Sequence, residues 1–229
     1  MGRPTPRQSL RWQSVPGRVG AVTTDRPTHT TLVGSQTIEL PVVTLHPDLA
    51  IALLICVDHG IAFTERAGAE LAAMLVPFDV DLVVSVATMG IPLAIEVSRS
   101  LGRDDYLILH KTPKIHLGDS LSEPLTSITT DARQRLRMDP ARVHAVAGRR
   151  VAVVDDVIST GASVRAALAL LRRVGADPVV IGALVTEGSD WSTALGPDAE
   201  RVRSLGAIPV FRPGADGTMI ADWGSVPGP

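Results

Sequence analysis

Residues 151–163 read VAVVDDVISTGAS, and they are the most informative segment of the chain. An apolar strand delivers two adjacent carboxylates, Asp155 and Asp156, to the carboxyl edge of a sheet, where open α/β folds bind their ligands. A turn of small residues then opens a helix, and its glycine, its hydroxyl groups and its successive N–H groups make a ready anion site. The residues of this turn are Ser159, Thr160, Gly161, Ala162 and Ser163.

Acids beside an anion site indicate a ligand that carries both a phosphate and vicinal hydroxyl groups. A ribose 5-phosphate, with or without a hard divalent cation, meets this description. The Walker pattern and the Gly-x-Gly-x-x-Gly pattern are both absent, so nucleoside triphosphate and NAD sites lose their main support. Two alternatives stay open, a receiver domain and a purely structural turn with solvent-facing acids. Receiver domains, however, carry their acids near the domain start and lack Thr-Gly at the helix opening.

Strands and helices alternate on both sides of this segment. Apolar runs predict strands, and apolar residues at helical spacing predict helices. Repeated β-α-β units with near-continuous apolar strands indicate an α/β fold, a parallel twisted sheet with helices on both faces. The predicted strands are 37–45, 49–57, 80–86, 106–109, 150–154 and 179–185, and the predicted helices are 61–76, 91–101 and 163–174.

The acidic segment resembles the phosphoribosyl pyrophosphate (PRPP) signature of type I phosphoribosyltransferases, two acids followed by a short apolar pair and Thr-Gly. The resemblance covers about residues 37–187 and is closest to the adenine/xanthine branch. It implies that Asp155 and Asp156 are catalytic, because they would orient the ribose hydroxyls and stabilise developing positive charge. It also implies that residues 159–163 hold the 5-phosphate.

The loop Ala87-Thr88-Met89-Gly90 follows the predicted strand 80–86 and resembles the pyrophosphate-binding loop of the same family. In that family the loop often contains a strained cis peptide that is not followed by proline, which here would join Ala87 and Thr88. Met89 departs from the pattern, since adenine-type members often carry arginine at this place. A cation for the pyrophosphate is therefore expected from another segment.

Basic residues follow the predicted strand 106–109 in the cluster His110-Lys111-Thr112-Pro113-Lys114. The cluster is similar to the Arg-Lys-x-x-Lys segment of adenine phosphoribosyltransferases, with His110 in place of arginine. Its position after a strand directs it toward the same edge of the sheet, and lysine binds phosphate as a point charge. We expect Lys111 and Lys114 to bind pyrophosphate, with Lys111 also counted among the catalytic residues.

Residues 111–140, rich in proline, serine and threonine, interrupt the alternation. The resemblance makes them a mobile loop that closes over PRPP and excludes water. Within the loop, Ser127, Thr129 and Thr130 resemble a polar segment of adenine- and xanthine-type members. Glu123 is the candidate for removing a proton from the base.

The resemblance further implies a small N-terminal hood over the base, at about residues 37–60. In the family the base is commonly recognised by backbone groups and by residues after the last core strand. In this sequence those residues include Glu187 and Trp191. Trp191 is a candidate for stacking on a purine ring, although a tryptophan that covers the core edge is equally compatible with the sequence.

Composition excludes several classes of protein. With 22 basic and 24 acidic side chains among 229 residues, the net charge is −2, and nucleic acid is not the expected partner. The longest apolar run, 49–57, is too short to span a membrane. The lone Cys56 excludes an intrachain disulfide and fits a cytoplasmic location. Residues 1–35, rich in arginine and proline, are predicted to be a disordered tail, and residues 36–229 a single domain.

We therefore expect a phosphoribosyltransferase of purine salvage that transfers the 5-phosphoribosyl group from PRPP to a purine-like nucleobase of adenine or xanthine type and releases pyrophosphate. No residue is assigned as a direct metal ligand, because Mg²⁺ is expected to arrive with PRPP, held mainly by pyrophosphate, water and ribose hydroxyls. The family commonly forms homodimers. The alternative is a non-catalytic PRPP-binding regulatory protein.

Overall fold

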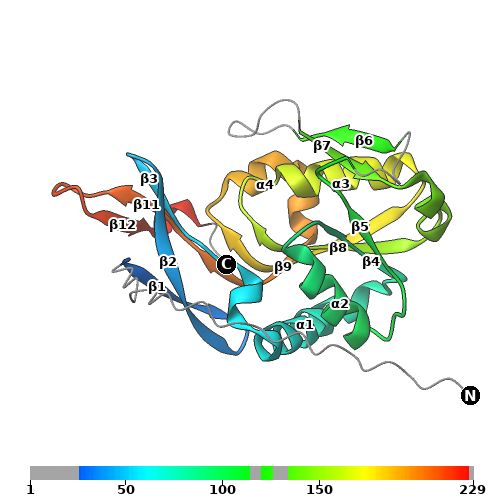
Figure 1. Cartoon of the computed structure of the whole chain (residues 1–229), viewed down its shortest axis with the longest axis horizontal. Helices are drawn as coiled ribbons and strands as arrows, with labels where there is room; N and C mark the ends of the chain where they lie inside the picture. The colour runs from blue at the N-terminus through cyan, green and yellow to red at the C-terminus, as the bar shows by residue number, and fades with distance from the viewer. Residues whose placement is uncertain (1–25, 114–119, 126–133, 227–229) are drawn as a thin grey trace, which may run out of the picture.

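A five-stranded parallel sheet forms the centre of the protein in the computed structural model, which describes residues 26–113, 120–125 and 134–226 (Figure 1). The strand order is β10-β9-β8-β4-β5, and all four neighbouring pairs are parallel. The predicted α/β class is confirmed. The strands are β4 (Leu82–Val86), β5 (Tyr106–Leu109), β8 (Arg150–Ile158), β9 (Asp177–Glu187) and β10 (Val202–Ile208).

Helices cover both faces of this sheet (Figure 1). Side chains alternate between the faces along a strand, so one strand contributes to two cores. In β8, Ala152 and Val154 pack in the core that holds α1 and α2, whereas Val151 and Val153 pack in the core that holds α3. The helices are α1 (Ile61–Leu75), α2 (Gly90–Ser100), α3 (Ala162–Arg173) and the short α4 (Asp190–Leu195).

Strand β8 is longer than the sequence predicts. The predicted strand ends at residue 154, but parallel pairing with β9 continues as far as Ile158 opposite Thr186. The two acids at 155 and 156 therefore lie inside the strand rather than after it. This extension fixes the backbone of both residues, which a loop would not do.

A second five-stranded sheet, which we call the hood, lies beside the core (Figure 1). Its order is β1-β2-β3-β11-β12, and its neighbouring pairs are antiparallel. Chain segments from both ends of the domain build it, because β11 pairs with β3. The strands are β1 (Thr28–Val33), β2 (Gln36–His46), β3 (Leu49–Ala52), β11 (Val210–Pro213) and β12 (Met219–Asp222).

The hood corrects the prediction of a disordered tail over residues 1–35. Strand β1 lies in that range, and alternate residues Thr31 and Val33 are buried where it pairs with β2. Its β-branched sequence, THTTLV, suits a half-buried strand. The arginines and prolines that suggested disorder lie nearer the N-terminus, in residues outside the described part of the chain. The predicted strand 49–57 is also too long, since β3 ends at Ala52.

The predicted mobile loop at 111–140 contains an antiparallel pair of strands, β6 (Leu121–Pro124) and β7 (Arg135–Met138). Leu136 and Met138 are buried in the same core as α3. The carboxylate of Glu123 lies 3.1 Å from the guanidinium of Arg173 on that helix. This ion pair holds Glu123 on α3, so its predicted role as a base for proton removal is not supported. Ser127, Thr129 and Thr130 fall outside the described residues.

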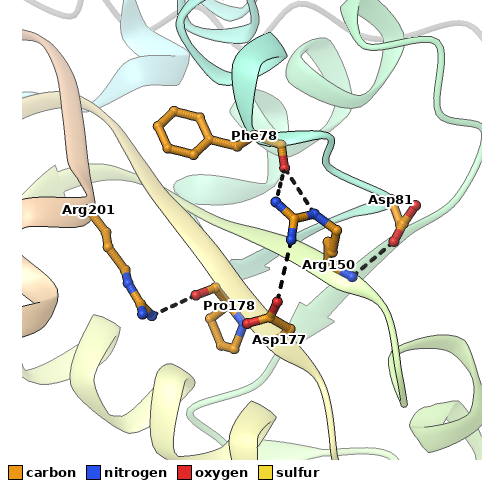
Figure 2. A network of polar contacts seen from close by, with 6 residues as sticks. All are labelled: Phe78, Asp81, Arg150, Asp177, Pro178 and Arg201. Carbon is orange, nitrogen blue, oxygen red and sulfur yellow. Dashed lines mark hydrogen bonds and ion pairs between the residues drawn. The ribbon is translucent and has the colours of Figure 1, made fainter.

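A polar network fastens the amino edge of the core sheet, opposite the acids of β8 (Figure 2). The backbone N–H of Arg150 donates to the carboxylate of Asp81 at 2.9 Å, and its guanidinium donates to the carbonyl of Phe78 at 3.0 Å. These contacts tie β8 to the segment before β4. The members drawn in Figure 2 are Phe78, Asp81, Arg150, Asp177, Pro178 and Arg201.

Short 3-10 helices complete the structure at Cys56–His59, Val76–Phe78, Pro140–Ala145, Gly196–Arg201 and Trp223–Ser225. Across the described residues, no helix combines the length and apolar character needed to cross a membrane.

Candidate active site

Asp155 and Asp156 are part-buried at the carboxyl half of β8. The backbone N–H of Asp156 donates to Oδ1 of Asp155 at 3.1 Å. Burial raises the pKa of both carboxyl groups; the charge of Asp156 raises the pKa of Asp155 further, and Lys111 opposes the rise in each. A cation or a developing positive charge nearby would stabilise the ionised form of desolvated carboxylates of this kind.

Asparagine at position 155 should stabilise the free protein increasingly as the pH rises. Burial raises the pKa of Asp155 from 3.8 to about 8, so the folded state holds this proton more tightly than the unfolded chain. The free energy of unfolding therefore falls as the pH rises between those values, and Asp155→Asn removes this loss. We expect a gain in the free energy of unfolding, and hence in Tm, that is larger at pH 8 than at pH 5. Thermal denaturation of both proteins at the two pH values measures it; an equal gain at both would contradict the assignment.

The turn from Ser159 to Ser163 leads from β8 into α3. Gly161 has φ 72° and precedes the first residue of the helix. A Cβ atom there would lie 3.1 Å from the carbonyl oxygen of Trp191, so both the backbone conformation and the close approach of α4 favour glycine. The Thr160 hydroxyl accepts a weak hydrogen bond from the backbone N–H of Ala162 at 3.4 Å. The turn thus presents hydroxyl and N–H groups at a helix start.

The loop at 87–90 lies directly beside the acid pair. Its Ala87–Thr88 peptide bond is cis, the geometry that the family resemblance implies. A Cβ atom on Gly90 would lie 2.9 Å from Oδ1 of Asp155, which measures how closely the loop approaches that carboxylate. The Met89 carbonyl accepts a hydrogen bond from Sγ of Cys56 at 3.0 Å. The structure therefore brings the predicted pyrophosphate loop and the predicted ribose acids together.

Of the predicted basic cluster, Lys111 acts electrostatically on both Asp155 and Asp156, which places its charge near the acid pair. The backbone of His110 exchanges hydrogen bonds with Arg137 of β7, at 2.9 and 2.8 Å. Arg137 also donates from Nη1 to the carbonyl of Lys111 at 3.3 Å. The sequence did not suggest this support. Lys114 lies outside the described residues.

A cavity of about 710 Å³ opens between the carboxyl edge of the core sheet and the hood. Its core side includes Asp156, Ser159, Thr160 and Glu187, so it is continuous with the predicted ribose and phosphate site. Its hood side includes Val210 and Arg212 of β11, and Ser225 follows from the C-terminal segment; the sequence did not suggest these three. The remaining lining residues are Leu45, His46, Leu49, Ile51, Ala52, Leu53, Leu54, Val157, Gly188, Ser189 and Asp190.

The two predicted base residues have different surroundings. Glu187 lines the cavity, is 6% exposed, and has a pKa raised by burial, while the Ser159 hydroxyl donates to its carboxylate. Trp191 packs in the core with α3, and its indole N–H donates to the carbonyl of Gly188 at 3.0 Å. With Trp191 buried in this way, its predicted stacking on a base is corrected to a structural role. The hydrogen bond from its indole to Gly188, which lines the cavity, instead supports the cavity wall.

Residues 65–200 match the family model of the phosphoribosyl transferase domain. The chain belongs to this family. The match includes the loop at 87–90, Lys111, the acid pair, the phosphate turn and Glu187, so the phosphoribosyltransferase domain carries all the described site residues of the core sheet. The hood strands lie outside the match.

Individual relatives differ in what they do. The phosphoribosyltransferase domain is 30% identical to orotate phosphoribosyltransferase 2 of Mesorhizobium japonicum over 66% of this chain and 73% of the relative. It is 32% identical to transcriptional regulator GfcR 2 of Methanosarcina barkeri over 59% of this chain and 54% of the relative. Three curated relatives, this regulator among them, are spanned over only 23%, 54% and 48% of their own length.

Among solved structures, adenine phosphoribosyltransferase from Thermoanaerobacter pseudethanolicus has the same fold. It aligns with a TM-score of 0.58 at 20% identity, over 73% of this chain and 95% of that one. The likeness establishes the fold of the phosphoribosyltransferase domain.

Proposed function

We propose that the protein transfers the 5-phosphoribosyl group from PRPP to a purine-like nucleobase, of adenine or xanthine type, and releases pyrophosphate. One observation carries this proposal. Asp156 of the part-buried acid pair and Ser159 and Thr160 of the turn line a cavity of about 710 Å³ covered by the hood, and the loop at 87–90 closely approaches Asp155. This arrangement supports separate binding of the sugar, the phosphate, the leaving group and the base.

In the proposed reaction, each part of the site acts on one part of PRPP. Residues 159–163 bind the 5-phosphate with hydroxyl and N–H groups, while Asp155 and Asp156 orient the ribose hydroxyls. The bond from the anomeric carbon to pyrophosphate breaks as a base nitrogen attacks that carbon. Carboxylates held in place stabilise the positive charge that develops there. Lys111, with Lys114, and the loop at 87–90 stabilise the negative charge on the departing pyrophosphate.

The acid pair is compatible with Mg²⁺ that arrives with PRPP. The described residues contain no group of three or more His, Cys, Asp or Glu side chains arranged to hold a metal ion. Two adjacent carboxylates with raised pKa values nevertheless suit a cation that keeps most of its ligands from water and substrate oxygens. When bound, Mg²⁺ neutralises charge on the pyrophosphate. Asp155 and Asp156 are the residues that would contact it or its water.

Purine salvage in the cytoplasm, by a homodimer, is the setting that we propose for this activity. The adenine/xanthine-like signature supports purine salvage, the lone, buried thiol of Cys56 supports a reducing compartment, and the resemblance to the family supports a homodimer.

The alternative function is PRPP sensing without chemistry. Its support is the 32% identity to a transcriptional regulator over 59% of this chain. In both functions the phosphate turn and the acid pair bind PRPP, and only the transfer step separates them.

Binding and turnover together decide between the two functions. We expect PRPP with Mg²⁺ to raise Tm by several degrees, because at 100 times Kd a ligand adds about 2.7 kcal/mol to the free energy of unfolding. We then expect pyrophosphate release in the presence of at least one purine base. A thermal-shift titration measures the first, and a coupled pyrophosphate assay across a panel of bases measures the second. Stabilisation by PRPP with no release for any base would favour the sensor.

A further inference from the structure

The cavity wall on the hood side is aliphatic. Leu49, Ile51, Leu53, Leu54 and Val210 line it, and the described lining includes no phenylalanine, tyrosine or tryptophan. A volume of about 710 Å³ lies within the range of small-molecule sites. A flat heterocycle can therefore be held between aliphatic side chains, but these provide no hydrogen bonds. Discrimination between bases has to come from the polar groups of the cavity.

Several of those polar groups are already engaged within the protein. The Ser225 hydroxyl accepts from the Val210 N–H and donates to the Asp222 carbonyl. The Gly188 N–H donates to the Ile208 carbonyl, and the Gly188 carbonyl accepts from Trp191. These groups fix the shape of the wall, and their principal hydrogen-bonding capacity is used.

Glu187 differs from the other ionisable residues of the cavity in being deeply buried. It is 6% exposed, whereas Asp156 is part-buried and His46, Asp190 and Arg212 are exposed. Within the described part of the chain, the one side chain that donates to its carboxylate is Ser159. A carboxylate has acceptor sites for about four hydrogen bonds, so most of this capacity is open to a ligand in the cavity. A ligand that fills the cavity without offering donors to this carboxylate would leave it unsatisfied, which is costly.

The charges of the cavity lining also favour a base that is not an anion. Its lining carries three acidic side chains, Asp156, Glu187 and Asp190. The cationic Arg212 is exposed, and its Nη1 donates to the carbonyl of Asp48 at 3.1 Å. A base that is itself an anion would bring negative charge against the buried carboxylate of Glu187.

We infer that Glu187 is a specificity-determining residue that selects an uncharged purine carrying an exocyclic amino group, such as adenine or guanine, over xanthine and orotate. The inference rests on the proposed function and narrows its acceptor. The amino group donates to the carboxylate, and in guanine the adjacent ring N–H donates as well, while the aliphatic hood covers the ring. Ser159, which lies in the phosphate turn, orients the carboxylate through its hydroxyl. Anionic bases, and bases that offer oxygen acceptors at this place, are rejected.

The acceptor panel tests the inference on the unaltered protein. We measure kcat/KM by pyrophosphate release with adenine, guanine, hypoxanthine, xanthine and orotate at saturating PRPP and Mg²⁺. One amino-bearing purine is expected to exceed each of the other three by at least about tenfold. Preference for xanthine, hypoxanthine or orotate would overturn the inference and leave the proposed transfer reaction intact. If none of the five bases supports pyrophosphate release, both the inference and the proposed transfer reaction are overturned.

Glu187→Gln tests the residue itself. The amide keeps the shape but replaces acceptor capacity with N–H donors, so kcat/KM for the amino-bearing purine should fall about 10–100-fold. The value for xanthine should stay level or rise. Glu39→Gln is the matched control, because it makes the same substitution at an exposed residue of β2 that does not line the cavity, and the ratio between bases should change less than about twofold. Equal losses for all bases in the Gln variant, or an equal change of ratio in the control, would overturn the assignment.

Discussion

The double variant Asp155→Asn with Asp156→Asn is expected to lose at least about 10³-fold in kcat for pyrophosphate release while keeping its fold. Removing a group that stabilises transition-state charge costs about 10²–10³-fold, and here two such groups are removed. The amide side chains keep the volume of the carboxylates, and the Asp156 N–H can still donate to the oxygen at position 155. Pre-steady-state and steady-state release assays, with circular dichroism for the fold, make the measurement.

The matched control uses a second pair of adjacent acids, Asp104 and Asp105, which precede β5 at the opposite edge of the sheet. Both are exposed, and Asp105 forms an exposed ion pair with Arg142 at 2.7 Å. Replacing this pair by asparagine removes the same formal charge and should cost at most about 1 kcal/mol in stability, with kcat unchanged. Near-native release by the variant at 155 and 156 would refute the roles assigned to them.

The core sheet and its carboxyl edge could be predicted because local sequence determines both. Apolar runs separated by helices specify parallel strands, and residues that follow such strands meet at one edge. The neighbourhood of Gly90, Lys111 and Asp155 could therefore be expected from positions far apart in the sequence. The structure places Gly90 so close to Asp155 that a Cβ atom on it would lie 2.9 Å from Oδ1, and it places the charge of Lys111 near the same carboxylate.

The hood could not be completed from the sequence, because its strands pair across almost the whole length of the chain. Val210 lies opposite Ile51, and short strands such as β11 carry little periodic signal of their own. The base cavity depends on this pairing, so Arg212 and Ser225 were missed. The role of Trp191 was left open for a related reason: a tryptophan at a sheet edge has the same sequence pattern whether it faces a ligand or the core. In the structure, the burial of Trp191 against α3 and its hydrogen bond to the carbonyl of Gly188 decide the matter.

Gly90→Ala should reduce both stability and turnover, and Ser85→Ala should restore the stability. A Cβ atom at position 90 would collide with the buried hydroxyl of Ser85 and would lie 2.9 Å from Oδ1 of Asp155. Overpacking of this kind costs about 1–3 kcal/mol. Because the Ser85 hydroxyl has no hydrogen-bond partner within the described residues, Ser85→Ala alone should be neutral or slightly stabilising, and it removes the worse of the two collisions.

A double-mutant cycle on these two positions separates packing from catalysis. We expect the double variant to regain most of the Tm lost by Gly90→Ala, which gives a coupling energy of about 1–2 kcal/mol. Turnover should remain about 10–100-fold below that of the unaltered protein, since the new methyl group still displaces the Asp155 carboxylate and fills space beside the leaving group. Thermal denaturation and pyrophosphate release on all four proteins give the cycle. Recovery of both Tm and turnover in the double variant would mean that the loop at 87–90 acts only through packing. Full additivity of the two Tm changes would mean that the Ser85 hydroxyl does not limit the approach of the loop to β8.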